Sequence, residues 1–117
     1  MVKSFTLVLG VVLLGVGIWG WTTGGHDHNL IIFGINFKHN VVHILSGVVA
    51  LLAALAGAKY ARLYCLIFGA VYGLVAIAGF LNISRAVSVL NLNRADNMLH
   101  LAIAASCLWV GFQAKDS

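Results

Sequence analysis

The chain has 117 residues, of which 62% are hydrophobic and only 9% charged, and it contains no proline. Charged residues usually make up about a quarter of a soluble chain, so this composition excludes an ordinary water-soluble domain. The formal net charge of +4 does not indicate a nucleic-acid partner, because the seven Lys and Arg residues are spread singly instead of forming a basic patch.

Four apolar runs follow one another along the chain, at residues 5–21, 41–58, 63–83 and 95–114. A helix needs roughly 17–25 residues to cross the hydrocarbon core of a bilayer, and each run reaches that length. The runs are continuous and do not alternate with polar residues, which argues against a transmembrane barrel. We therefore predict an all-α integral membrane protein, with residues 1–117 forming a single membrane domain in the lipid bilayer.

The sequence also resembles itself, which predicts two repeated helical hairpins, at residues 5–58 and 63–114. In the first span of each hairpin, glycines recur at matching positions, as with Gly20 and Gly79. Because each hairpin crosses the membrane twice, both copies enter from the same side. We expect a four-transmembrane-helix bundle whose repeats run parallel about a pseudo-twofold axis along the membrane normal.

A polar motif of the form Asn-x-x-x-Asn-x-x-His is the most specific part of this repeat, because it stands at the start of both even-numbered spans. Its residues are Asn36, Asn40 and His43 in the first copy and Asn93, Asn97 and His100 in the second. Three polar residues at one spacing are hard to obtain by chance in so apolar a chain. The motif therefore marks the first place to look for function.

The connections between the spans differ in length and charge. The loops at residues 22–39 and 84–94 carry apolar patches, which we expect to lie flat in the membrane interface or to form short helices. The link at residues 59–62 is tight and carries Lys59 and Arg62. With Lys3 and Lys115 on the same side, this slight bias favours both termini in the cytoplasm.

All five histidines are expected on or just inside the face opposite the termini: His26, His28, His39, His43 and His100. Residues four apart share a face of a helix, so His39 stacks with His43 and Asp96 with His100. If the repeats converge, these four side chains are a plausible ligand set for a first-row metal such as zinc or iron.

Other interpretations of the same residues remain open. His43 or His100 is a candidate axial ligand of a tetrapyrrole cofactor, and histidine is also a candidate proton-sensitive switch. The structural interpretation is that Asn40 or Asp96 caps a helix start, while the histidines hydrogen-bond across the repeats. In that case the structural polar motif, Asn36, Asn40, Asn93 and Asn97 with its histidines, pins the bundle together.

No catalytic group is expected. Cys65 and Cys107 fall in different spans and are interpreted as small buried hydrophobic residues, with no disulfide implied. No serine or cysteine has an evident neighbouring base, and no acidic residue stands within a span interior, which weighs against active transport.

The two entrance motifs resemble a bacterial family of four-span membrane proteins known as domain of unknown function 4383. That family is similar in carrying His-Asn-x-x-His before its second span and Asp-Asn-x-x-His before its fourth; here these are His39-Asn40-x-x-His43 and Asp96-Asn97-x-x-His100. The resemblance covers residues 7–112 and implies the fold, the topology and a place in the bacterial inner (plasma) membrane, but no activity.

We expect a small multi-pass membrane protein of unknown activity, non-enzymatic, acting as an accessory subunit of a larger membrane complex or as a homo-oligomer. The alternative is a protein that binds a metal or a tetrapyrrole through His39, His43, Asp96 and His100. The two expectations differ in whether the two polar entrances meet in space.

Overall fold

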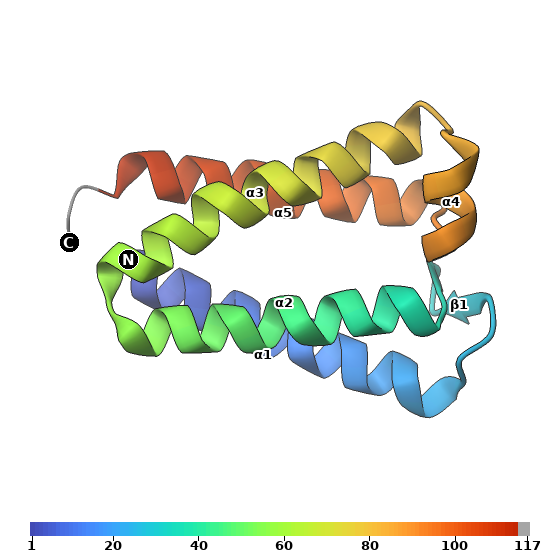
Figure 1. Cartoon of the computed structure of the whole chain (residues 1–117), viewed down its shortest axis with the longest axis horizontal. Coiled ribbons are helices and arrows are strands. Elements are labelled where there is room, and N and C mark those ends of the chain that lie inside the picture. The colour runs from blue at the N-terminus through green and yellow to red at the C-terminus, as the bar shows by residue number, and fades with distance from the viewer. Residues whose placement is uncertain (115–117) are drawn as a thin grey trace.

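A computed structural model describes residues 1–114 and consists of four long helices with a small cap at one end (Figure 1). The long helices are α1 (Val2–Thr23), α2 (Phe37–Ala56), α3 (Ala58–Phe80) and α5 (Arg94–Gln113). They contain 20 to 23 residues each, which corresponds to about 30–35 Å at 1.5 Å per residue. All four are long and apolar enough to cross a membrane, which confirms the predicted all-α membrane bundle.

The side chains are distributed as they are in a membrane protein. Large apolar residues point outward, with Leu55 78% and Leu74 67% exposed, whereas Thr6, His43 and His100 are at most 4% exposed. Because lipid solvates apolar side chains and offers nothing to a polar one, polar groups are retained in the protein interior. The outer surface of the helices is therefore the lipid-facing surface.

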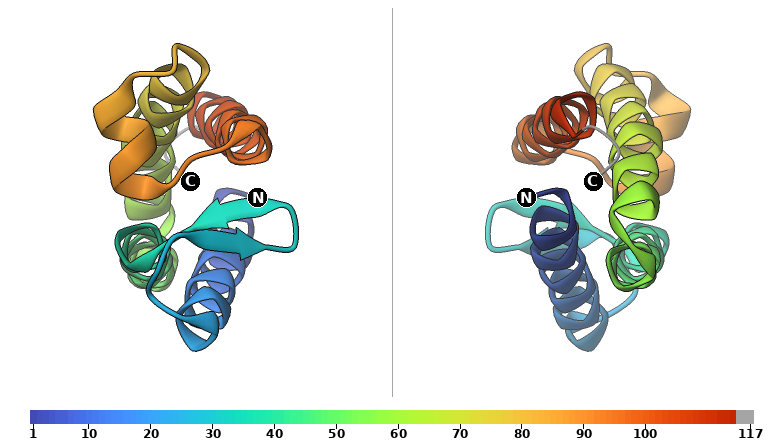
Figure 2. Two further views of the ribbon diagram at one scale, coloured as in Figure 1. Left: turned by 90° about the vertical axis from the view of Figure 1, so that its right-hand side faces the viewer. Right: turned by 90° about the vertical axis from the view of Figure 1, so that its left-hand side faces the viewer.

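The four long helices pack chiefly as two pairs, α1 with α2 and α3 with α5. Figure 1 shows the two pairs one above the other, and Figure 2 shows them end-on. Between α1 and α2 the backbones touch, since a Cβ added to Gly47 would lie 2.6 Å from the backbone nitrogen of Leu14. Small residues at helix contacts allow this close approach, which is a main source of helix association in lipid.

The turn between the pairs lies at Gly57, where the backbone has φ of 140°. A positive φ is accessible to glycine without a steric penalty, so the turn needs a single residue there. This differs from the predicted link at residues 59–62, because Lys59 and Arg62 already lie in the first turns of α3. Lys115, which entered the predicted charge bias, lies outside the described residues.

The cap at the other end comprises a β-hairpin and a short helix. Strands β1 (His28–Leu30) and β2 (Phe33–Ile35) pair antiparallel, and α4 (Ser84–Leu90) follows α3. We call this end of the bundle the loop end; the start of α1 and the end of α5 lie at the opposite end (Figure 1). The apolar patch of the second loop forms a short helix, as one of the two expectations held, whereas the hairpin in the first loop was not predicted.

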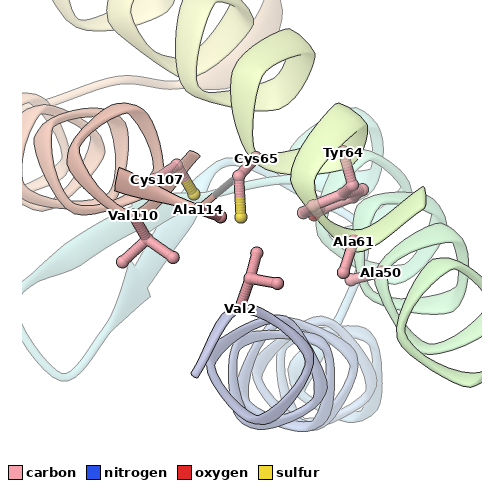
Figure 3. Close-up of a cluster of buried hydrophobic side chains, with 8 residues drawn as sticks. All are labelled: Val2, Ala50, Ala61, Tyr64, Cys65, Cys107, Val110 and Ala114. Carbon is pink, nitrogen blue, oxygen red and sulfur yellow. The ribbon is translucent and has the colours of Figure 1, made fainter. Parts of the chain in front are cut away.

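Near the termini the interior is apolar and small-residue-rich, and Figure 3 shows its members. They are Val2, Ala50, Ala61, Tyr64, Cys65, Cys107, Val110 and Ala114. Both cysteines are fully buried and free, and Cys65 lies 3.4 Å from the hydroxyl of Thr6. Above this cluster a second apolar layer of Leu13, Tyr72 and Ala104 separates it from the loop end.

Candidate metal centre

The starts of α2 and α5 are fixed by asparagine caps. The side chain of Asn36 accepts a hydrogen bond from the backbone N–H of His39 at 2.9 Å, and that of Asn93 accepts one from Asp96 at 2.9 Å. The Asp96 carboxylate in turn accepts a hydrogen bond from the Asn93 backbone N–H, which completes a capping box. The caps are thus Asn36 and Asn93, and not Asn40 as one interpretation held.

Asn40 and Asn97 lie one turn further into their helices and face glycines. A Cβ at Gly20 would overlap the side-chain oxygen of Asn40, and one at Gly79 would overlap that of Asn97. Each asparagine therefore occupies the space that the missing side chain leaves on the neighbouring helix. At these two places glycine is required by the close approach of a polar side chain.

The capping groups also reach across the bundle to the loop of the other helix pair. Asn36 donates from its side-chain amide to the Val89 carbonyl at 2.8 Å, and Asn93 donates in the same way to the Ile32 carbonyl at 3.0 Å. Asn91 donates to the Ile35 carbonyl at 3.0 Å. These bonds join the β-hairpin to the segment after α4 and bring the starts of α2 and α5 together.

Three histidines meet beneath this cap. The ring centroids of His39 and His43 lie 4.5 Å apart, those of His39 and His100 5.4 Å, and those of His43 and His100 6.0 Å. One nitrogen from each ring lies within 4.8 Å of those of the other two. The structure therefore brings together three of the four residues of the predicted ligand set.

The orientation of His39 is determined by a backbone carbonyl. Its Nδ1 lies 2.9 Å from the Leu90 carbonyl oxygen, and because that oxygen can only accept, Nδ1 carries the proton. The lone pair is then on Nε2, which is buried with no hydrogen-bond partner among the described residues. Metal-bound histidines characteristically donate their other N–H to a carbonyl or carboxylate in this way.

The same region contains a concentration of buried polar atoms without partners within residues 1–114. They are His39 Nε2, His43 Nδ1 and Nε2, His100 Nδ1, both amide atoms of Asn40, Asn97 Oδ1 and the Tyr72 hydroxyl. Each unsatisfied buried polar group costs about 1–3 kcal/mol. Seven of these eight atoms belong to the two entrance motifs, so the free-energy cost is concentrated at one site.

Asp96 and the loop histidines are engaged elsewhere. One carboxylate oxygen of Asp96 accepts from the backbone N–H groups of Gly34 and Asn93, and Asp96 does not belong to the group of three converging ligands. His28 bonds Thr23 through one ring nitrogen and the His26 carbonyl through the other. His26 is exposed at the surface.

The fold and this site together define a class: a four-span membrane protein with a buried histidine cluster under a hydrogen-bonded cap. The chain matches the family described as a domain of unknown function, DUF4383, over residues 3–113, and it belongs to that family. No curated protein and no solved structure matches it significantly.

Two contributors to the site were not found from the sequence. The Leu90 carbonyl is a backbone group, so no residue type in the sequence marks it. Asn91 lies outside the repeated motif, and its backbone is left-handed, with φ of 50°. Asparagine tolerates this conformation better than most residues, and that preference was the one signal available. The three histidines and the two capping asparagines were all among the residues selected from the sequence.

Removing the Asn91 side chain tests the cap. We expect Asn91→Gly to lower the free energy of unfolding by about 1–3 kcal/mol, because glycine keeps the left-handed backbone while two buried carbonyls lose their donor. Unfolding in mixed detergent micelles measures the change. Asn82→Gly is the matched control, since Asn82 also has a positive φ of 54° but an exposed side chain. Equal effects of the two substitutions would contradict a role for the Asn91 hydrogen bonds.

Proposed function

We propose that this protein binds a transition-metal ion within the membrane through His39, His43 and His100. The observation that carries the proposal is the convergence of three buried imidazoles, 1–4% exposed, each of which has at least one ring nitrogen without a partner among the described residues. An apolar layer lies beneath them and the cap covers them. Imidazole is a ligand suited to zinc, copper, iron and nickel.

The spacing of the nitrogens agrees with an ion-sized site. Bonds of about 2.0–2.1 Å in tetrahedral geometry separate two donor nitrogens by roughly 3.4 Å. The three nitrogens lie within 4.8 Å of one another, which is close to this spacing. The hydrogen bond from His39 to Leu90 supplies the outer partner that orients a ligand ring.

The geometry favours a single ion over a tetrapyrrole. Axial ligation by both His43 and His100 requires a flat macrocycle between the two rings, and ligation by either one alone requires it beside that ring. The His39 ring lies 4.5 Å from that of His43 and 5.4 Å from that of His100, and it fills the neighbouring space. Inserting a macrocycle would require α2 and α5 to separate and the cap to open.

Reciprocal contacts support the predicted repeat. Asn36 bonds the Val89 carbonyl and Asn93 bonds the Ile32 carbonyl. The alignment that pairs Asn36 with Asn93 also pairs Ile32 with Val89, so the two bonds are copies exchanged between the halves. We propose that the pseudo-twofold axis passes between these halves and close to the histidines, with the asparagine caps pinning them together.

The proposal keeps the expectation of binding without catalysis. We propose, as expected from the sequence, that the protein acts as a homo-oligomer or as an accessory subunit of a larger membrane complex. Native mass measurement in mild detergent tests that setting, since a monomer without partners would count against it. The side of the membrane on which the termini lie is likewise still the prediction made from Lys59 and Arg62.

Metal analysis of gently purified protein tests the proposal. We expect one transition-metal ion per chain and a loss of thermal stability when a strong chelator removes it. An ion at a hundred times its dissociation constant stabilises the folded state by about 2.7 kcal/mol. Purified protein that neither contains nor takes up an ion, and whose melting temperature is indifferent to added metals, would refute it.

A separate prediction concerns Asp96. We expect Asp96→Asn to lower the free energy of unfolding by about 1 kcal/mol or more, because the carboxylate is part of the cap of α5. The metal stoichiometry should stay at one per chain, since the carboxylate is bonded to Gly34 and Asn93. Loss of stoichiometric binding in a folded Asp96→Asn protein would instead make Asp96 a ligand, as the sequence predicts.

A further inference from the structure

We infer that the ion held by this site is monovalent, copper(I) in chemical class, and not a divalent ion such as zinc(II). The inference rests on the proposed function and names the ion for the same three histidines. It follows from the charge of the donors, the burial of the site and the number of donors that the fold supplies.

The charge balance is the first argument. His39, His43 and His100 contribute neutral donors and are at most 4% exposed. The cost of transferring an ion into a medium of low dielectric constant rises with the square of its charge, so a divalent ion costs about four times as much as a monovalent one. Neutral donors do not neutralise the charge of the ion, so they do not offset the charge-dependent part of this free energy.

The carboxylates of the chain determine how much positive charge at the site can be compensated. Within residues 1–114 the acidic side chains are Asp27 and Asp96, and Asp27 is exposed at the surface and bonded to Asn36. Asp96 alone is buried beside the site, at 1% exposed. Its single negative charge balances one positive charge, whereas a divalent ion would leave an uncompensated charge in the membrane interior.

The number of donors is the second argument. Zinc held by three histidines takes a fourth ligand, usually water, in an open position. Here the cap covers the histidines on one side, and Leu13, Tyr72 and Ala104 lie on the other. The oxygens without partners in this region, those of the Tyr72 hydroxyl and of the Asn40 and Asn97 amides, are neutral as well. Copper(I), with a single charge, is stable at low coordination numbers, so three nitrogen donors satisfy it without a fourth ligand.

The buried thiols require a control. Thiolate is a softer ligand than imidazole and selects copper(I), and Cys107 lies seven residues beyond His100, roughly 10 Å along α5. The binding measurements are therefore made in a Cys65→Ser, Cys107→Ala background. Serine at position 65 keeps a hydrogen-bonding group next to the Thr6 hydroxyl. Alanine is chosen at position 107 because the other copy of the repeat has Ala50 at the corresponding position.

The experiment is a competition titration on the full chain in detergent under anaerobic conditions. Copper(I) is supplied from a chromophoric chelator, silver(I) serves as a probe that resists redox chemistry, and zinc(II) and cobalt(II) are titrated in parallel. We expect one copper(I) or silver(I) per chain, bound at least a thousandfold more tightly than zinc(II). His100→Gln should lower the copper(I) affinity at least a hundredfold, and X-ray absorption should show three nitrogen neighbours.

Each other outcome is decisive. Zinc(II) or cobalt(II) bound as tightly as copper(I) and lost in His100→Gln would overturn the inference while the proposed function stands. Copper(I) bound by the wild-type chain but absent from the folded cysteine-free protein would place the metal on the thiols and overturn the inference. Binding of none of the four ions would remove both the inference and the proposed function.

Discussion

His43→Gln is expected to lower the metal affinity of this protein at least a hundredfold while the bundle stays folded. His43 faces both other rings, and its two nitrogens have no hydrogen-bond partner among the described residues. Losing an outer partner of a metal ligand already costs 10–100-fold, so losing the ligand costs at least the upper end of that range. Equilibrium competition with a chelator measures the affinity.

The control for His43→Gln is His26→Gln, because His26 is exposed in the loop and outside the converging group. We expect no change in affinity from it. Glutamine resembles histidine in size, and removing His43 breaks no hydrogen bond described in the structure, so circular dichroism and melting of the metal-free protein should match wild type. Collapse of the metal-free His43→Gln protein would favour a purely structural role for His43.

Gly47→Ala is expected to destabilise the protein strongly, lowering the free energy of unfolding by about 3 kcal/mol. The added Cβ would lie 2.6 Å from the Leu14 nitrogen and 2.8 Å from the Gly10 oxygen, and both are backbone atoms of α1. Backbone cannot rotate aside as a side chain can, so α1 and α2 must separate. Unfolding in mixed micelles measures the loss.

Gly15→Ala is the matched control, since it makes the same substitution in a long helix. A Cβ at Gly15 has nothing within 4 Å, and alanine has the better helix propensity, so we expect a change near zero or a small stabilisation. If Gly47→Ala proved as mild as Gly15→Ala, close packing of α1 on α2 would not be a main source of stability.

The two predictions are linked by the fold. His39 and His43 are carried by α2 and His100 by α5, which belong to different helix pairs. The site therefore forms only if each pair is packed internally and the cap joins them. We expect Gly47→Ala to weaken metal binding as well, although it lies a full turn away from the nearest ligand.

Much of the fold was predictable because lipid imposes simple rules on sequence. A span must be long, apolar and helical, so the four runs were recognised from length and hydropathy, and the described part of the chain has four long apolar helices. The polar motif was recognised because asparagine and histidine are costly in such a chain. For the same reason the three converging histidines all belong to residues chosen from the sequence.

Other features were decided by tertiary contacts that have no local signal. Ile31 adopts a left-handed backbone, with φ of 59°, which its branched side chain disfavours. The hairpin forms there because Asn91 and Asn93 bond its carbonyls from the other half of the chain. A local propensity argument could not foresee bonds from more than fifty residues away.

By itself, then, the sequence determined the membrane class, the four spans and the polar residues at the starts of α2 and α5. Only the tertiary structure decided which of those residues cap a helix, which bond other backbone groups and which converge at the site. Asn36 and Asn93 cap, Asp96 bonds backbone N–H groups, and the histidines converge with a lone pair of His39 directed by the Leu90 carbonyl. The physical reason is that hydropathy acts residue by residue, whereas hydrogen-bond partners are chosen by which backbone groups the packed helices bring within 3 Å.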